Sequence, residues 1–276
     1  MTAGLAAGRA VARAAGSAVR PAGWAVALAA MCCSCSGPAK PATLSIAAAA
    51  DLRFALEDVI RDFRAPHRNV VVQVAYGSSG NFYSQIQNHA PFDLFLSADV
   101  EYPRRLAREG VAQPDSVFVY AVGRIVVWAP VKSPLDVEGL RMRVLESDLV
   151  KHVAIANPQH APYGRAAEAA MRSSGVYDRV APKLVLGENI AQTMEFVQSG
   201  AADVGIVALS LALAPAVRQQ GKYWEVPLDA YPRLEQGGAI LKQAHSPEAA
   251  RAFRQFLLTG GGAATLRRYG FSLPDK

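Results

Sequence analysis

Four junctions along the chain could bind an anion without using a positive charge. At each junction an apolar segment runs into a short neutral turn, and a helical pattern follows; the junctions span residues 45–52, 70–80, 153–158 and 184–190. A helix N-terminus presents backbone N–H groups that have no intrahelical acceptor, together with the positive end of the helix dipole. Several such ends meeting in one cleft would form an oxyanion site that needs neither Lys nor Arg.

Two side chains in or near these turns are candidates for direct ligand contact. Ser79 lies in the Gly-Ser-Ser-Gly motif at residues 77–80 and is either a turn or N-cap serine or a ligand-binding one. Tyr163 stands between a proline and a glycine after the third junction, where it either packs or contacts a ligand. Both hydroxyl groups can donate a hydrogen bond to an anion.

The same region shows no complete catalytic pattern. The motif at residues 77–80 lacks the Gly-x-Ser-x-Gly spacing of a nucleophile elbow, and the chain has neither a Walker loop nor a Gly-x-Gly-x-x-Gly fingerprint. The five histidines are scattered without metal-ligand spacing, and only His160 falls in a candidate loop, where packing is the favoured interpretation. The pattern favours a binding protein over an enzyme.

Composition and charge argue against nucleic acid as a partner. The chain has 276 residues, 51% of them hydrophobic, which suggests one large domain or two lobes of ordinary size. Its formal net charge is +6, but four of the 29 basic residues and none of the 23 acidic residues lie within residues 1–43. The remainder is nearly neutral and has no basic run with interleaved aromatic residues, so we expect no nucleic-acid binding.

Residues 1–43 have the pattern of an export signal followed by a Pro-rich tether. Three arginines precede the apolar run at residues 24–31, which is too short to span a bilayer as a helix. A disordered Ala-rich leader is the alternative interpretation.

All three cysteines, at positions 32, 33 and 35, directly follow the apolar run. The folded body therefore has no disulfide framework and no thiol chemistry. Cys35 is the candidate for lipid attachment, as in a bacterial lipoprotein, and ordinary cleavage after Ala39 is the alternative.

From residue 43 onward, strand and helix patterns alternate. Asp51 is a good N-cap, and apolar residues after it recur at helical spacing, which predicts a helix over residues 52–63. Strands are predicted at residues 153–156 and 204–208, among others, and Gly260–Gly262 is predicted to be a stop and hinge between two C-terminal helices. The alternation predicts an α/β fold with largely parallel sheets, in which ligands bind beyond the carboxyl ends of the strands.

The order and spacing of several short motifs carry a family resemblance that extends from Leu44 to Leu273. The chain resembles the periplasmic molybdate-binding proteins of bacterial molybdate ABC transporters. The motifs that carry the resemblance are found at residues 47–52, 77–80, 93–99, 157–164, 205–207 and 268–271.

The resemblance implies a two-lobed, type II periplasmic-binding-protein fold with a hinge, in which each lobe is a mostly parallel sheet flanked by helices. Residues 44–122 plus 231–276 are expected to form lobe one, and residues 123–230 lobe two, after a signal peptide and tether at residues 1–43. The implied protein is exported to the periplasm or cell envelope, possesses no enzymatic activity and needs no cofactor or metal cation. Its implied partners are the small oxyanion and a membrane permease, and it is expected to be a monomer.

The resemblance also implies the ligand and its contacts. Molybdate or tungstate would be held by backbone N–H and hydroxyl groups at Asp51, Ser79, Tyr163 and Ile190, without a counter-ion. Many members have serine where this chain has Asp51, and some have a tyrosine hydroxyl where this chain has Ala208. The Tyr163 hydroxyl is one candidate to replace that missing donor.

The departure at Asp51 leaves alternatives open. We predict that its carboxylate turns away from the ligand and caps the helix over residues 52–63; the rival is that it faces the ligand and accepts a proton from it. The rival would suit another tetrahedral oxyanion, sulfate-like or phosphate-like. An enzyme on the same fold and an exported adhesion or structural module are the alternatives of other classes.

Overall fold

The computed structural model of the protein describes residues 41–274. The predicted export signal, Cys35 and most of the tether lie outside the described residues. The end of the predicted tether is not a tether, because Ala42 and Thr43 already belong to the first strand, β1 (Ala42–Ala49). Within residues 41–274, no helix has the length and apolar character needed to cross a membrane.

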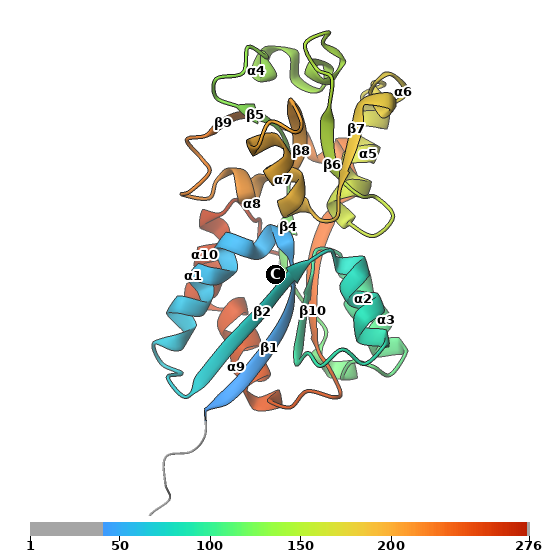
Figure 1. Ribbon diagram of the computed structural model, residues 1–276. Coiled ribbons are helices and arrows are strands. Elements are labelled where there is room, and N and C mark those ends of the chain that lie inside the picture. Colours follow the sequence, from blue (N-terminus) through green and yellow to red (C-terminus); the bar gives the residue numbers. More distant parts are fainter. Residues whose placement is uncertain (1–40, 275–276) are drawn as a thin grey trace, which may run out of the picture. The chain divides into compact units, whose positions relative to one another are not determined.

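The described residues form two five-stranded sheets, one in each of two lobes (Figure 1). We call the lobe that contains β1 lobe one and the other lobe two. The sheet of lobe one has the strand order β2 (Val70–Gly77), β1 (Ala42–Ala49), β3 (Leu94–Ser97), β10 (Leu234–Ile240) and β4 (Phe118–Gly123). The sheet of lobe two has the order β7 (Leu184–Gly187), β6 (Val153–Ala156), β8 (Val204–Ala208), β5 (Ile125–Pro130) and β9 (Gly221–Glu225).

One strand in each sheet runs against the other four. β1 pairs with β2 and β3 in parallel, whereas β10 is antiparallel to both β3 and β4. In lobe two, β6 pairs with β7 and β8 in parallel, and β5 is antiparallel to both β8 and β9. The predicted α/β fold with two lobes and mostly parallel sheets is confirmed.

The two reversed strands are those that the chain enters directly after passing from one lobe to the other. β4 ends at the carboxyl edge of its sheet, and β5 begins two residues later in the other sheet; β9 and β10 repeat this passage in the opposite direction. A strand that enters at the carboxyl edge of a parallel sheet must run against its neighbours. The carboxyl edges of both sheets therefore face the space between the lobes, where ligands of open α/β sheets bind.

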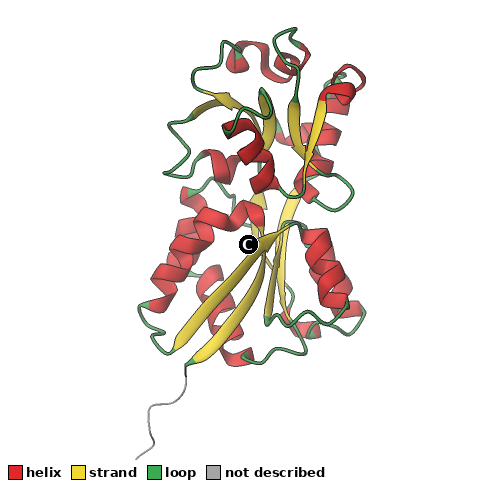
Figure 2. Ribbon diagram, viewed as in Figure 1, coloured by secondary structure: helices red, strands yellow, loops and turns green. Residues whose placement is uncertain are grey.

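Helices cover the sheet of lobe one on both faces (Figures 1 and 2). One side carries α1 (Arg53–Arg64), α9 (Pro247–Leu258) and α10 (Gly260–Arg268), and the other carries α2 (Ser79–Gln87) and α3 (Glu101–Arg108). Strand β1 shows why both faces are needed, because Ile46 and Ala48 pack in one apolar cluster and Ala47 packs in another. Alternate side chains of a strand point to opposite faces, so this buried strand needs a cover on each.

Lobe two has shorter elements around its sheet. Its helices are α4 (Val137–Leu140), α5 (Pro162–Ser173), α6 (Tyr177–Val180), α7 (Ile190–Gln198) and α8 (Leu209–Ala212). The 3-10 helices of the described residues are η1 (Ala50–Leu52), η2 (Pro114–Ser116), η3 (Arg141–Glu146), η4 (Ala181–Lys183) and η5 (Leu228–Ala230). The lobe limits, residues 44–122 plus 231–276 for lobe one and 123–230 for lobe two, stay a prediction. In the structure, the chain passes from the sheet of lobe one to that of lobe two between Gly123 and Ile125, and it returns between Glu225 and Leu234.

The prediction that Gly260–Gly262 forms a hinge between two helices is wrong. α10 begins at Gly260, and only Thr259 separates it from α9. A Cβ atom on Gly262 would lie 2.5 Å from the carbonyl oxygen of Phe256 and 2.7 Å from the Cα of Leu257. The glycine therefore lets the first turn of α10 approach the end of α9 closely, which a run of glycines does not reveal by itself.

This close approach predicts different effects for two neighbouring substitutions. We expect Gly262→Ala to lower the free energy of unfolding by about 1–3 kcal/mol, because the new methyl group forces the backbone of α9 to shift. Gly261→Ala is the matched control, since its Cβ would meet its nearest neighbour, the Phe256 ring, at an ordinary 3.4 Å. Urea unfolding of both variants measures the difference, and equal stability would contradict the packing argument.

Candidate functional site

The four residues predicted to bind the ligand line one cavity between the lobes. Asp51 and Ser79 come from lobe one, and Tyr163 and Ile190 come from lobe two. The space free of protein atoms in and around the cavity is about 190 Å³ including open solvent, and the centre of a water-sized sphere can occupy about 10 Å³ of it. Its other lining residues are small or apolar: Ala49, Ala50, Gly77, Ser78, Ala98, Ala161 and Pro162. In the part of the chain that the structure describes, no Lys, Arg or His lines this cavity.

Ser79 can present two donors to the cavity. It is the first residue of α2, so its backbone N–H has no intrahelical acceptor. Ser78, the N-cap, accepts from the N–H of Asn81 at 3.4 Å and leaves that of Ser79 unused. The Ser79 Oγ accepts from the N–H of Ala98 at 2.9 Å, so its own hydrogen can still be donated to a ligand.

Ile190 offers a single backbone donor at the start of α7. The N-cap Asn189 accepts with its side chain from the N–H groups of Ala191 and Gln192, at 3.0 and 3.1 Å. The cap takes the second and third N–H groups of the helix, and the first, that of Ile190, has no intrahelical acceptor. A branched apolar residue can thus serve an anion without a polar side chain.

The prediction that Asp51 caps the following helix is wrong. The chain begins a 3-10 turn at Ala50, so Asp51 lies inside the first turn, and α1 starts only at Arg53 with Leu52 as a cap that makes no side-chain bond. The carboxyl group points elsewhere: its Oδ2 accepts from Tyr163 Oη at 2.9 Å and from Gln236 Nε2 at 2.5 Å. The spacing of apolar residues after Asp51 predicts the helix but does not reveal that a 3-10 turn begins one residue before Asp51, at Ala50.

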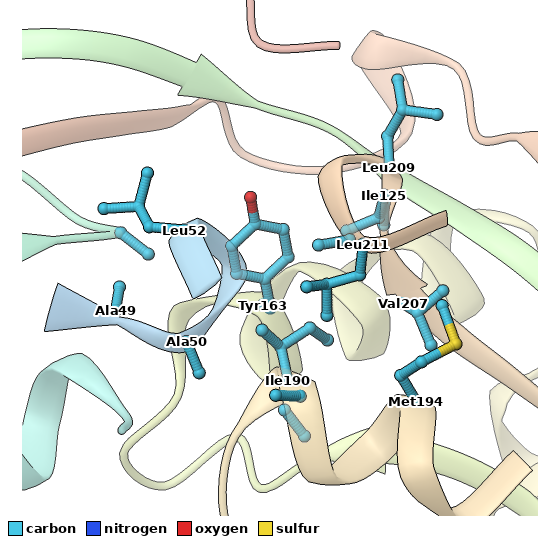
Figure 3. Packing of buried hydrophobic residues seen from close by; sticks show 14 of the residues in the cluster. Ala49, Ala50, Leu52, Ile125, Tyr163, Ile190, Met194, Val207, Leu209 and Leu211 are labelled. Carbon is cyan, nitrogen blue, oxygen red and sulfur yellow. The ribbon is translucent and has the colours of Figure 1, made fainter. Parts of the chain in front are cut away.

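Tyr163 uses its hydroxyl for Asp51, although the sequence suggested it as a replacement for a donor lost at Ala208. Its ring is buried in the apolar cluster that also contains Leu52, Ile190 and Leu211 (Figure 3). A Cβ atom on Gly123 would lie 2.3 Å from the Tyr163 Oη, so the glycine provides the room for this hydroxyl. What Tyr163 can offer a ligand is its backbone N–H in the first turn of α5.

Sequence reasoning missed two residues that hold Asp51. Gln236 lies on β10 at a register shift, and its Nε2 also donates to Tyr163 Oη at 3.0 Å. Ser210 on α8 donates its hydroxyl to the carbonyl oxygen of Asp51 at 2.8 Å. The sequence contains one weak signal for Gln236: it is an uncharged polar residue at the start of the otherwise apolar segment of residues 236–240, directly before a Gly-Gly pair.

The electrostatics of the site centre on Asp51. Burial raises the pKa of this carboxyl group to about 6, although the hydrogen bonds from Gln236 and Tyr163 and the polarity of the nearby N–H groups of Asp51 and Leu52 oppose the increase. Burial and the charge of Asp51 raise the pKa of both Tyr163 and Tyr120 well above the usual value, so both stay neutral. The Oδ1 of Asp51 is buried without a hydrogen-bond partner among the described residues.

Polar contacts at the rim join the lobes beside the cavity. The N–H of Gly80 on α2 donates to the carbonyl oxygen of His160 at 2.9 Å, and a Cβ atom on Gly80 would lie 2.6 Å from that oxygen. The His160 Nδ1 lies 2.9 Å from Ser78 Oγ, and its Nε2 lies 3.7 Å from a Glu188 carboxylate oxygen. The other oxygen of Glu188 accepts from the side-chain amide of Asn81.

Two further ion pairs cross the cleft. Arg53 on α1 contacts Glu195 on α7 at 3.0 Å, and Arg165 on α5 contacts Asp99 after β3 at 2.7 Å. Together with the His160 contacts, these pairs connect the two lobes beside the cavity.

The order serine, histidine, glutamate at the rim does not make a catalytic triad. Ser78 Oγ accepts a hydrogen bond as the cap of α2, and the 3.7 Å between His160 and Glu188 is too long for a hydrogen bond. His160 instead contacts Ser78 across the cleft, and the interpretation that it only packs in its loop stays a prediction. Among residues 41–274, no group of three or more His, Cys, Asp and Glu side chains could hold a metal ion.

The buried carboxyl group predicts how stability depends on pH. The folded-state pKa of Asp51, about 6, lies above its ordinary value of 3.8, so folding favours the protonated form. This contribution is complete below about pH 4 and is lost as the pH rises through 6. Asp51→Asn keeps an acceptor for Tyr163 and Gln236 but carries no charge, so we expect it to raise the free energy of unfolding by about 1–3 kcal/mol at neutral pH.

Urea unfolding of the wild-type protein and of Asp51→Asn at about pH 4 and about pH 8 measures this difference. The gap between the two proteins should be present at the higher pH and shrink at the lower one. A gap that is the same at both pH values would show that Asp51 carries no buried charge.

Known proteins resemble this chain in sequence and in fold. The family model "Bacterial extracellular solute-binding protein" matches residues 44–272. The molybdate-binding protein ModA of Rhodobacter capsulatus is 43% identical over 72% of this chain and 77% of its own length, and that of Azotobacter vinelandii is 36% identical over 85% and 92%. The solved Azotobacter vinelandii periplasmic molybdate-binding protein superimposes with a TM-score of 0.79 at 31% identity, covering 84% of this chain and all of its own. The chain belongs to the bacterial extracellular solute-binding protein family, in the group of its relatives named ModA.

Proposed function

We propose that this protein binds molybdate or tungstate between its two lobes and delivers the oxyanion to the membrane permease of an ABC transporter. One observation carries the proposal: the cavity is lined by neutral donors from both lobes and by no basic side chain of the described residues. The names of the relatives, molybdate-binding proteins, support the choice of ligand. The ligand contacts are proposed at Asp51, Ser79, Tyr163 and Ile190.

Neutral donors are sufficient for tight binding. The backbone N–H groups of the four proposed residues and the Ser79 hydroxyl give about five hydrogen bonds, each worth roughly 1.5–3 kcal/mol to a charged acceptor. After the cost of ordering the closed lobes, a net binding free energy of about −8 to −12 kcal/mol is reasonable, which corresponds to micromolar to nanomolar dissociation constants. The ligand needs no cofactor and no metal cation to bind.

The proposals on delivery, export, lipid attachment and lobe limits rest on the family and on the sequence of residues 1–43. Closure of the two lobes around the ligand is the change that a permease can read. We propose an exported monomer without enzymatic turnover, whose chain is processed within residues 1–43 and is attached to a lipid at Cys35. The lobes are proposed to comprise residues 44–122 plus 231–276 and residues 123–230.

Asp51 lines the cavity, and its carboxyl group makes a second class of ligand a candidate. A carboxylate at Asp51 would favour a tetrahedral oxyanion that keeps a hydroxyl group, such as a phosphate-like ion, because that hydroxyl needs an acceptor. Sulfate has no such hydroxyl at neutral pH. An oxyanion panel that includes phosphate and sulfate therefore separates the two ligand classes.

Ligand-induced stabilisation tests the proposed function. We expect molybdate and tungstate to stabilise the purified protein by roughly 2.7 kcal/mol at about 100 times the dissociation constant, which raises the melting temperature by a few degrees. Sulfate at the same concentration is the control and should have little effect. An unchanged melting curve in millimolar molybdate would reject the assignment.

Removal of one donor tests the proposed contacts. We expect Ser79→Ala to weaken molybdate binding by about 1–3 kcal/mol, because the buried anion loses a hydroxyl donor while the protein keeps the backbone N–H. Ser84→Ala, at an exposed position of the same helix, is the matched control. Isothermal titration calorimetry measures both, and wild-type affinity in Ser79→Ala would remove this hydroxyl from the site.

A further inference from the structure

The carboxyl group of Asp51 divides its two oxygens between different environments. Oδ2 accepts hydrogen bonds from Tyr163 and Gln236, at 2.9 and 2.5 Å. Oδ1 is buried and has no partner among the described residues, while the residue itself lines the cavity. An unpartnered buried oxygen is costly, so the arrangement is incomplete until something bonds to Oδ1.

An ionised Asp51 and a bound dianion are incompatible in this cavity. The lining contains no basic side chain in the described part of the chain, so no positively charged side chain compensates two neighbouring negative charges. Like charges that share a desolvated site resolve the conflict when one of them takes up a proton. Molybdate remains a dianion at neutral pH, which makes the carboxyl group the better place for that proton.

Resting on the function proposed above, we propose that Asp51 binds the oxyanion as a neutral carboxylic acid, which donates a hydrogen bond from Oδ1 to a ligand oxygen. Oδ2 already accepts two hydrogen bonds, so the proton belongs on Oδ1. In this form both carboxyl oxygens have partners, and the acid acts as one more neutral donor beside the backbone N–H groups. One proton is taken up from solvent for each dianion bound.

The surroundings of Asp51 favour this protonation state. The elements packed around it present Tyr163 from α5, Tyr120 from β4, Gln236 from β10 and Ser210 from α8. The two tyrosines are the titratable groups among them, and both are neutral because their pKa values are raised. Burial, opposed by the hydrogen bonds from Gln236 and Tyr163, raises the pKa of Asp51 to about 6, and a bound dianion raises it further.

Affinity for molybdate as a function of pH tests the inference. In the purified wild-type protein, the dissociation constant should increase about tenfold or more between about pH 6 and about pH 8, because the free carboxyl group must be protonated first. Calorimetry in two buffers of different ionisation enthalpy should show an uptake of close to one proton per molybdate at about pH 8. A pH-independent affinity without proton uptake would overturn the inference and leave the proposed function intact.

Asp51→Asn separates the acid donor from its alternatives. The amide supplies a permanent donor where Oδ1 stands, so this variant should bind molybdate with an affinity that no longer depends on pH and with no proton uptake. If the ligand rather than Asp51 carried the proton, uptake would persist in Asp51→Asn, and the inference would fall. Glu195→Gln removes an exposed acid at the cleft rim and should keep the wild-type pH dependence. No binding by the wild-type protein or Asp51→Asn at either pH would overturn the proposed function, and the inference with it.

Discussion

The carboxyl group of Asp51 is buried where lobe one, lobe two and the returning strand β10 meet. Asp51 lies in the 3-10 turn after β1, and Tyr163 lies in the first turn of α5 in lobe two. Gln236 lies on β10, the strand with which the chain returns to lobe one. Gly123, at the first crossing, leaves the space that the Tyr163 hydroxyl occupies. The two lobes, and the two segments in which the chain passes between them, thus meet at one hydrogen-bonded group. A buried network of this kind stabilises the structure only when each polar atom in it has a hydrogen-bond partner.

The topology explains why the network forms at the cleft. Each crossing leaves the carboxyl edge of one sheet and enters the carboxyl edge of the other, which reverses β5 and β10 and brings both edges together. The turns after β1, β2, β6 and β7 then point into the same space, and helices or 3-10 turns begin there. Free N–H groups from distant parts of the sequence converge because the chain crosses between the lobes twice.

Much of this could be predicted from the sequence, because the signals are local. The bounds of β6 and β8 were predicted to the residue, since short apolar runs between turns define buried strands. The resemblance to the molybdate-binding proteins implied that Ser79, Tyr163, Ile190 and Asp51 share one site, and the structure brings them to one cavity. What could not be predicted depends on distant contacts: the direction of the Asp51 carboxyl group is set by Gln236, 185 residues away, and the close packing at Gly262 depends on where α9 ends.

The exposed ion pairs at the rim contribute little to closure of the cleft. The side chains of Arg53 and Glu195 are 46% and 58% exposed, and that of Glu188 is 59% exposed. Ion pairs this exposed contribute about 0–1 kcal/mol each, whereas the buried hydrogen bonds to a charged ligand contribute roughly 1.5–3 kcal/mol each. A ligand shifts a two-state equilibrium only through its greater affinity for one state. Under the proposed function, the donors of both lobes reach one oxyanion only when the lobes are closed. The ligand would then add to the buried bonds from Tyr163 and Ser210 to Asp51, while the exposed ion pairs at the rim contribute little to closure.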